Sequence, residues 1–191
     1  WRPMRRRTVI AASAAGILAD RGATAQTSAL AIPEEWKPRH VPTRNTKPYE
    51  IHVLPDRFSL LWTLPRDRAI RYTVGIGRPG LYEPGIFNVG AKKEWPSWTP
   101  TEEMIEREPE TYARFEDGMP GGPGNPLGAR ALYLFTEDGR DTFLRVHGTR
   151  DPSGLGRRVS NGCVRMMNGH VAHLYEQVPI GTPVYLHASR A

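Results

Sequence analysis

The chain has 191 residues, of which 39% are hydrophobic, 24% are charged and 9% are aromatic. This length fits one ordinary domain with a tail and excludes two large domains, and the hydrophobic content excludes a broadly disordered chain. The 18 prolines and 19 glycines exceed average usage, so the composition excludes a bundle of long helices and favours short strands joined by loops.

The first 25 residues contain the parts of an export signal. Residues 1–3 read as an extension before Met4, arginines fill positions 5–7, and an alanine-rich apolar run covers residues 11–19. The small residues at 23 and 25 then mark a cleavage site. The paired arginines and the weak hydrophobicity are typical of a twin-arginine signal, so we expect export to the periplasm. The alternative is an alanine-rich amphipathic helix, and the run is too short to be a transmembrane segment.

The net charge of +6 comes largely from this N-terminal segment. Five of the 26 basic residues and one of the 20 acidic residues lie within residues 1–25, so the rest of the chain has 21 basic and 19 acidic residues, a net charge of +2. Binding to nucleic acid needs a clustered basic face. We therefore expect no nucleic-acid partner.

The pattern after the signal predicts an extended segment followed by a mainly β domain. Residues 26–48 are polar and contain four prolines, which predicts an extended lead-in before a domain that spans residues 49–187. Short strand patterns separated by turn residues then cover residues 50–53, 58–64, 69–74 and 86–89. The glycine-rich residues 75–80 are not followed by a helical pattern, so we interpret them as a bend between strands and not as a phosphate-binding loop.

The middle of the chain predicts a short helix and a long loop. Thr99, with Pro100 at the first helical position and Glu102 three residues after Thr99, predicts a capped helix that ends near Arg107. Residues 118–128 are rich in proline and glycine and cannot form a helix or a central strand. Loops of this length are typical of lids over binding sites, and a disordered insertion is the alternative.

The last third of the chain predicts a hairpin, a helix and a final strand. Strand patterns over residues 131–135 and 142–147 flank an Asp-Gly turn. Asn168 can cap a helix with an apolar face, which stops at residues 179–181, and residues 183–187 form the final strand. Short strands at close spacing indicate a sandwich or a meander.

Cys163 is the only cysteine, so an exported chain would carry it as a free thiol with no internal disulfide. His147 lies sixteen residues earlier, at the end of a predicted strand. A nearby imidazole can deprotonate a thiol, and the N–H groups of Gly162 and Cys163 can face a developing oxyanion. The alternative is that Cys163 is a small buried side chain. A papain-type protease is disfavoured because such enzymes place the cysteine before the histidine.

Residues 147–149 and 160–168 together resemble the catalytic signature of the L,D-transpeptidase (YkuD-like) family. Residues 123–134 are similar to the stretch before the catalytic strand of that family, and residues 178–184 are similar to its closing segment. The resemblance covers residues 49–186. Many members have histidine where this chain has Asn161.

The resemblance implies a β-sandwich-like catalytic domain, with short helices and a long proline- and glycine-rich loop, that acts on peptidoglycan stem peptides. Cys163 would attack the third residue of a tetrapeptide stem, release D-alanine and hold the acyl group. His147, oriented by the backbone carbonyl of Gly148, would act as general base. An amine of a second stem would then take the acyl group.

Several alternatives remain open at this stage. Water as acceptor would make the protein an L,D-carboxypeptidase, and an outer-membrane protein as acceptor would make it an enzyme that attaches that protein to the wall. An inactive wall-binding module is an alternative of another class.

Four further residues are candidates to bind substrate. Arg165 can hold a carboxylate or form an ion pair that orders the cysteine loop, Ser160 and Asn161 can shape that loop, and Tyr133 can line the cleft. No cofactor is expected. His170 and His173 have no third ligand near them in the sequence, so no metal site is expected either.

Overall fold

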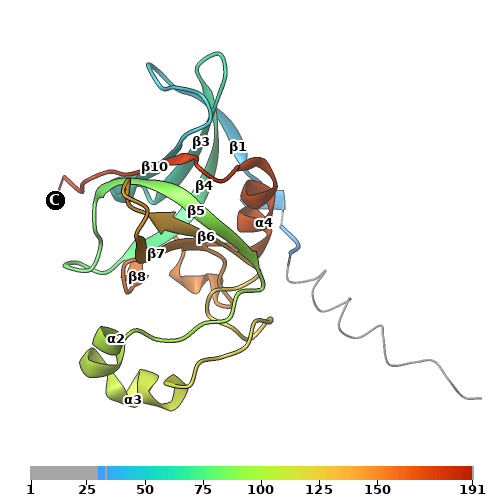
Figure 1. Ribbon diagram of the computed structural model, residues 1–191. Helices are drawn as coiled ribbons and strands as arrows, with labels where there is room; N and C mark the ends of the chain where they lie inside the picture. The colour runs from blue at the N-terminus through green and yellow to red at the C-terminus, as the bar shows by residue number, and fades with distance from the viewer. Residues whose placement is uncertain (1–29, 33, 191) are drawn as a thin grey trace, which may run out of the picture.

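A single sheet of ten strands is the central element of the protein (Figure 1). The computed structural model describes residues 30–32 and 34–190, so the signal expected over residues 1–25 lies outside the described residues. The strands are β1 (Arg39–Pro42), β2 (Ile51–Leu54), β3 (Ser59–Leu64), β4 (Arg68–Gly77), β5 (Gly85–Glu94), β6 (Arg130–Phe135), β7 (Asp141–His147), β8 (Arg158–Ser160), β9 (Val164–Met166) and β10 (Pro183–Leu186). The helices are α2 (Glu102–Arg107), α3 (Pro109–Tyr112) and α4 (Asn168–Gln177), and the 3-10 turns are η1 (Glu34–Trp36), η2 (Pro55–Arg57), η3 (Ala113–Phe115) and η4 (Pro152–Gly154).

The sheet closes on itself. Its strand order is β1-β4-β3-β2-β10-β5-β6-β7-β9, and β9 pairs with β4 as well as with β7. The path from β4 to β9 therefore returns to β4 and leaves no open edge within the ring. β1 and β8 pair with β4 in addition. Closure of this kind lets every strand of the ring form backbone hydrogen bonds with a neighbouring strand on both sides.

The core lies inside this closed sheet. Alternate residues of β4, namely Ile70, Tyr72, Val74 and Ile76, are at most 6% exposed. The apolar face of α4 packs against β6 and β7, where Val171, Leu174 and Val178 are buried as the sequence predicts. Each large side chain buried in this way contributes about 1.5–3 kcal/mol. None of the helices in the described part of the chain is long and apolar enough to span a membrane.

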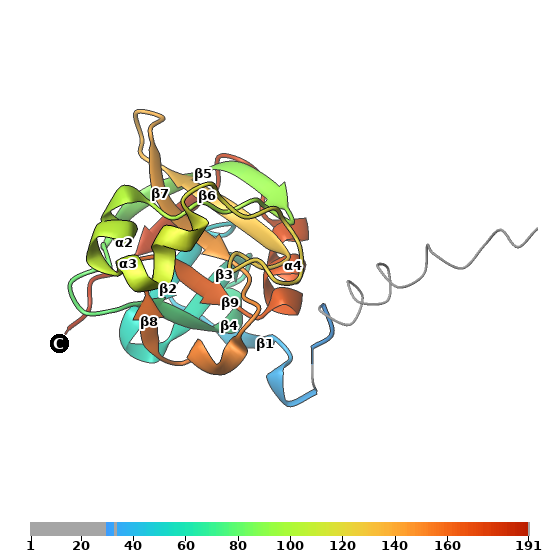
Figure 2. The ribbon, with the colours of Figure 1, turned by 90° about the horizontal axis from the view of Figure 1, so that it is seen from below.

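The segment between β5 and β6, residues 95–129, leaves the sheet and returns to it, and we call it the arm. It contains α2 and α3, which lie apart from the sheet in Figure 1 and in front of β8 and β9 in Figure 2. The loop over residues 118–128 belongs to the arm and is anchored by buried Asn125. The Nδ2 of Asn125 donates to the carbonyls of Met119 and Pro120 at 3.2 and 3.0 Å.

The mainly β class and the predicted strand positions are confirmed, and three details differ. Residues 75–77 belong to β4 and do not form a bend. Thr101, and not Thr99, caps α2, because its Oγ1 accepts from the N–H of Met104 at 3.3 Å. Met167 occupies the cap position of α4, while the Oδ1 of buried Asn168 accepts from the N–H of Ala129 at 2.9 Å.

Part of the predicted lead-in pairs with the domain. Residues 39–42 form β1, which runs antiparallel to β4 with Arg39 opposite Arg71. The extended conformation that the prolines favour therefore adds a short edge strand to the sheet.

The glycines that suggested a bend serve close packing instead. A Cβ on Gly75 would lie 2.5 Å from the backbone oxygen of Gly154, and a Cβ on Gly77 would lie 2.9 Å from the backbone of Tyr82. Only glycine leaves room for η4 and the turn after β4 to lie directly on the strand.

Gly75→Ala is therefore expected to destabilise the fold by about 1–3 kcal/mol, because backbone atoms at both sides of the clash have to shift. The measurement is the free energy of unfolding from urea titration. Gly124→Ala is the matched control, since nothing lies within 4 Å of its Cβ, and it should leave stability unchanged or raise it by up to about 1 kcal/mol. Equal stabilities of the two variants would contradict this account.

Candidate active site

Parallel pairing of β7 with β9 brings His147 and Cys163 to the same face of the sheet. Val146 lies opposite Val164, and both are fully buried in the core. Because side chains alternate along a strand, the next register pair, His147 and Arg165, points away from the core. Cys163 lies two residues before Arg165 and so shares that face. These three side chains line one cleft.

His147 is held in one tautomer by its own chain neighbour. The side chain is only 4% exposed, and its Nδ1 lies 2.5 Å from the carbonyl oxygen of Gly148. A carbonyl can only accept, so Nδ1 carries the proton and Nε2 has the lone pair. Burial, together with the charge of Arg165, lowers the pKa of His147 to about 3. The imidazole is therefore neutral and able to accept a proton.

The thiol of Cys163 lies against a distortion of β7. The β6–β7 register shifts between Tyr133 and Phe135, and Phe143 has a left-handed φ of 60°. The carbonyl of Phe143 turns toward the cysteine and lies 3.7 Å from Sγ, which donates to it. Burial raises the pKa of the Cys163 thiol above its ordinary value, while the charges of Arg145 and Arg165 oppose that rise.

Ser160 closes the loop that precedes Cys163. Its hydroxyl donates to the carbonyl of Cys163 at 2.6 Å and accepts from the N–H of Gly162 at 3.2 Å. Gly162 has a φ of 123°, which side-chain-bearing residues rarely adopt, so glycine is required there. The N–H of Gly162 is engaged inside the loop and does not face the cleft as a free donor.

The two arginines nearest the cysteine differ in their partners. Arg145 is 9% exposed and binds both carboxylate oxygens of Asp141, at 2.6 and 2.8 Å. No carboxylate of the described residues forms a salt bridge with Arg165, and its Nε is buried without a hydrogen-bond partner. Arg165 therefore has no direct ion-pair partner among the residues described, although Asp151 lines the same cleft. Hydrogen bonds from Ser153 lower the pKa of the Asp151 carboxyl, and the charge of Arg165 adds to that lowering. The ion pair that was its alternative role is absent from the described part of the chain.

Tyr133 does not line the cleft, contrary to the prediction. The guanidinium of Arg145 lies 4.1 Å from its ring centroid, which is the geometry of a cation–π contact. Tyr133 therefore supports Arg145, the residue whose backbone lies beside the thiol.

Asn161 connects the cysteine loop to the arm. Its Oδ1 accepts from Arg78 Nη2 at 2.6 Å, and its Nδ2 donates to the hydroxyl of Tyr112 at 2.8 Å. The same Nη2 of Arg78 also lies 2.5 Å from Glu108 Oε1. We call Arg78, Glu108, Tyr112 and Asn161 the latch. Arg78, Glu108 and Tyr112 could not be identified from the sequence, because no local pattern relates residues that lie 30 to 83 positions apart.

The arm supplies the apolar wall of the cleft. Its contributing side chains are Trp98, Met104, Tyr112, Phe115, Met119 and Leu127. The opposite wall is polar and carries the cysteine, the histidine and Arg165. The cleft has a volume of about 280 Å³ and is open to solvent, which places it near the lower end of the range of ligand pockets. The loop predicted as a lid or an insertion thus forms part of the cleft wall.

The sequence model of the L,D-transpeptidase catalytic domain (YkuD) matches residues 48–186, which include the whole closed sheet apart from β1. The chain belongs to the L,D-transpeptidase catalytic domain family. The expectation drawn from residues 147–149 and 160–168 is therefore confirmed at the level of the family.

Named relatives support the same family. A Fuscovulum blasticum protein named as an L,D-transpeptidase of the ATP synthase subunits region is 34% identical over 193 residues, which cover 91% of this chain and 94% of that protein. The probable L,D-transpeptidase YbiS of Escherichia coli K12 is 33% identical over 160 residues, covering 80% of this chain. That match spans only 50% of YbiS.

Solved structures share the fold. A Brucella melitensis protein named as a probable carnitine operon oxidoreductase is 43% identical, with a TM-score of 0.55 over 82% of this chain and 96% of that one. A mutant L,D-transpeptidase of Enterococcus faecium is 16% identical, with a TM-score of 0.55 over 74% of this chain and 50% of that one. The Enterococcus match shows the fold alone.

Glu108→Gln is expected to loosen the arm without unfolding the protein. The Arg78 and Glu108 side chains are 36% and 31% exposed, so their ion pair contributes at most about 1 kcal/mol to global stability. Backbone amides of residues 102–115 should exchange hydrogen several-fold faster, with little change in melting temperature. Glu106→Gln, which removes an exposed carboxylate of α2 with no ion pair, is the control. Equal exchange in both variants would show that the latch does not hold the arm.

The protonation states of the pair predict the pH dependence of thiol reactivity. Both groups are uncharged at neutral pH, because burial raises the pKa of Cys163 and lowers that of His147. The rate constant for alkylation by iodoacetamide should therefore rise about tenfold per pH unit from about pH 6 to 8, as the thiolate fraction does below the thiol pKa. Cys163→Ala removes the only thiol and serves as the blank. A rate that is constant over this range would indicate a preformed thiolate–imidazolium pair instead.

Proposed function

We propose that the protein is an exported peptidoglycan L,D-transpeptidase that acts in the periplasm through an acyl-enzyme on Cys163. One observation carries the proposal: the only thiol of the chain shares a cleft with an imidazole whose Nδ1 is fixed on the carbonyl of Gly148. Membership of the family supports the reaction class. The donor would be a tetrapeptide stem whose terminal D-alanine is released.

In the first half-reaction His147 Nε2 takes the thiol proton as Sγ attacks the carbonyl carbon of the third stem residue. A bond forms between Sγ and that carbon, and the carbonyl oxygen becomes an oxyanion. The N–H of Cys163 is the nearest candidate donor to it, because the N–H of Gly162 is engaged by Ser160. Collapse of the tetrahedral intermediate breaks the amide bond, and His147 returns its proton to the leaving D-alanine nitrogen.

In the second half-reaction an amine of another stem attacks the thioester. His147 removes the proton of the attacking amine, the new amide bond forms, and the thiol leaves with that proton. The same acyl-enzyme would give a shortened stem if water attacks, and an attached protein if an outer-membrane protein supplies the amine. The three outcomes differ only in the acceptor, and we propose cross-linking, in which the acceptor is the amine of another stem.

Arg165 is proposed to bind a carboxylate of the donor stem. Its guanidinium lines the cleft, forms no salt bridge with a carboxylate of the described residues and carries a buried Nε without a hydrogen bond. A carboxylate can satisfy two of its N–H groups at once. The apolar wall of the arm would cover the aliphatic part of the stem peptide.

Incubation of the purified chain with tetrapeptide muropeptides tests the proposal by mass spectrometry. We expect release of D-alanine and formation of cross-linked dimers, both abolished in Cys163→Ala, which should remain folded by circular dichroism. Arg165→Gln should lower kcat/KM by about tenfold or more, as the loss of a charged hydrogen bond does, and Arg68→Gln, at an exposed position outside the cleft, is the control. Dimers in Cys163→Ala would end the acyl-enzyme proposal, whereas binding without turnover would favour a wall-binding module.

A further inference from the structure

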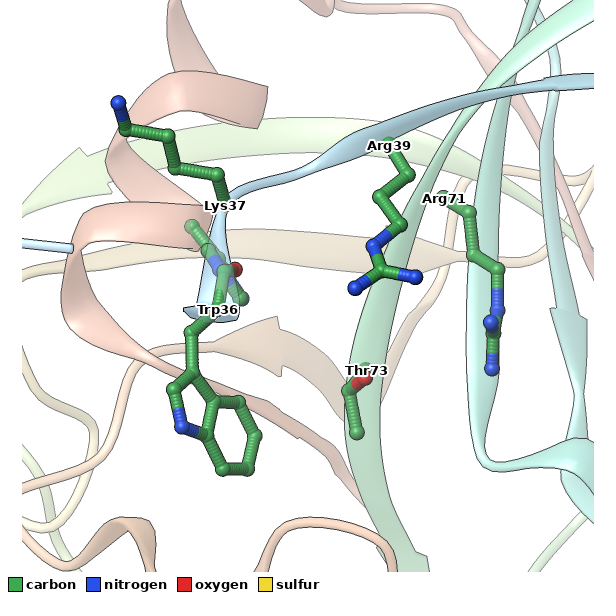
Figure 3. Close-up of a pocket in the computed structure, with 6 residues that line it drawn as sticks. Trp36, Lys37, Arg39, Arg71 and Thr73 are labelled. Atoms are coloured by element: carbon green, nitrogen blue, oxygen red, sulfur yellow. The ribbon is translucent and has the colours of Figure 1, made fainter. Parts of the chain in front are cut away.

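A second pocket lies on the outer face of β1 and β4, separate from the cysteine cleft (Figure 3). The residues that line it are Trp36, Lys37, Arg39, Arg71, Thr73 and His170. They come from η1, β1, β4 and α4, so four separate segments converge there. The pocket has a volume of about 120 Å³ and is open to solvent, so a ligand larger than a small anion extends out of it. No residue of this set lines the cysteine cleft.

Like charges face each other across this pocket. Arg39 and Arg71 are directly opposite in the antiparallel β1–β4 pair, an arrangement that is unfavourable without a counter-charge. Arg71 donates its Nε to Ser59 Oγ at 2.9 Å, and no carboxylate side chain that the structure describes forms a salt bridge with either arginine. In Figure 3 the guanidinium of Arg39 lies between the indole of Trp36 and the guanidinium of Arg71. An anion placed there would neutralise the repulsion.

A buried imidazole at the pocket wall is incompletely satisfied. His170 is 1% exposed and its Nε2 lies 2.6 Å from the carbonyl oxygen of Trp36. That carbonyl can only accept, so Nε2 carries the proton and Nδ1 is an acceptor. Nδ1 is buried without a hydrogen-bond partner among the described residues. Through Nε2, His170 serves to hold the carbonyl of Trp36, and with it the indole beside the pocket.

From this geometry we infer that the pocket binds an anionic sugar, that is, a sugar ring that carries a phosphate or a carboxylate. The oxyanion lies between Arg39 and Arg71, with the hydroxyl of Thr73 as a further donor. The apolar face of the ring packs on the indole of Trp36, whose backbone carbonyl is held by His170. Neither the anion alone nor a neutral sugar alone would use all of these groups.

The pocket and the cysteine cleft lie along one strand. Thr73 precedes Gly75 by two residues on the outer face of β4, and Gly75 is the register partner of Arg165. Arg71 and Gly75 are separated by about 14 Å, given the rise of roughly 3.4 Å per residue. The inference does not depend on any reaction at Cys163, so it stands or falls separately from the proposed function.

Amide and imidazole chemical shifts of the full chain, labelled with ¹⁵N, test this site. The probes are glucose 6-phosphate and glucuronate, and the controls are glucose and inorganic phosphate. At least one probe should produce saturable shifts at residues 36–39, at residues 71–73 and at the His170 ring. Arg39→Gln and Arg71→Gln should each weaken that binding about tenfold or more, as expected when a charged hydrogen-bond donor is lost.

Arg68→Gln is the matched control, because Arg68 is exposed on the same strand and lies outside the pocket. This variant has the same net charge as Arg39→Gln and Arg71→Gln. It should bind the probe as the unaltered chain does. Trp36→Ala should remove the preference for the sugar anion over inorganic phosphate. The absence of saturable shifts with both probes, an equal loss in Arg68→Gln, or equal affinity for inorganic phosphate and the better probe would each overturn the inference. The spectra themselves show whether each variant is folded.

Discussion

The parallel pairing of β7 with β9 is the contact on which the candidate site depends. β9 has only three residues and two register partners on β7, which is too little to hold it by hydrogen bonds alone. It is fixed because Val164 and Met166 are fully buried and because β4 pairs with its other edge. Core packing therefore sets the position of Cys163 and Arg165 on the outer face, and the presence of the thiol and the imidazole in one cleft is a consequence of the closed sheet.

The electrostatics around this pair favour a neutral resting state and an easy return of the proton. Burial opposes charge on both Cys163 and His147, so neither side chain is ionised before substrate arrives. The charge of Arg165 acts with opposite sign on the two groups: it favours a thiolate and disfavours an imidazolium. A proton that moves from sulfur to nitrogen therefore has a strong tendency to leave the ring again. That asymmetry suits an imidazole that must protonate a leaving amine.

The sequence predicts the elements well where the pattern is local. Alternating apolar residues locate the strands, and the Asp-Gly turn and the apolar face of α4 appear where the pattern places them. The pairing of His147 with Cys163 could be proposed because both residue types carry recognisable chemistry. The family resemblance then supplied the order of the surrounding segments.

Features that depend on contacts between distant segments could not be predicted. Glycines at 75 and 77 indicate a bend by composition, yet they serve close approach of backbone that lies 79 and 5 residues further along the chain. The cap of α2 was misplaced because Thr99 and Thr101 satisfy similar local rules and only the N–H of Met104 decides between them. The latch was missed because an arginine at a strand end and a glutamate after a short helix have no shared pattern.

The strand β4 shows how one period-two pattern can serve several surfaces at once. Its inward residues, Ile70 to Ile76 in alternation, form a continuous stretch of core. Its outward residues change in character along the strand, from arginine through threonine to glycine. Arg71 lines the cationic pocket at one end of β4. At the other end, Gly75 lets η4 lie directly on the strand and pairs with Arg165 of β9. A slip of one residue would place Arg71 and Thr73 in the core and expose Tyr72 and Val74, so the same burial that stabilises the sheet also fixes the register of both sites.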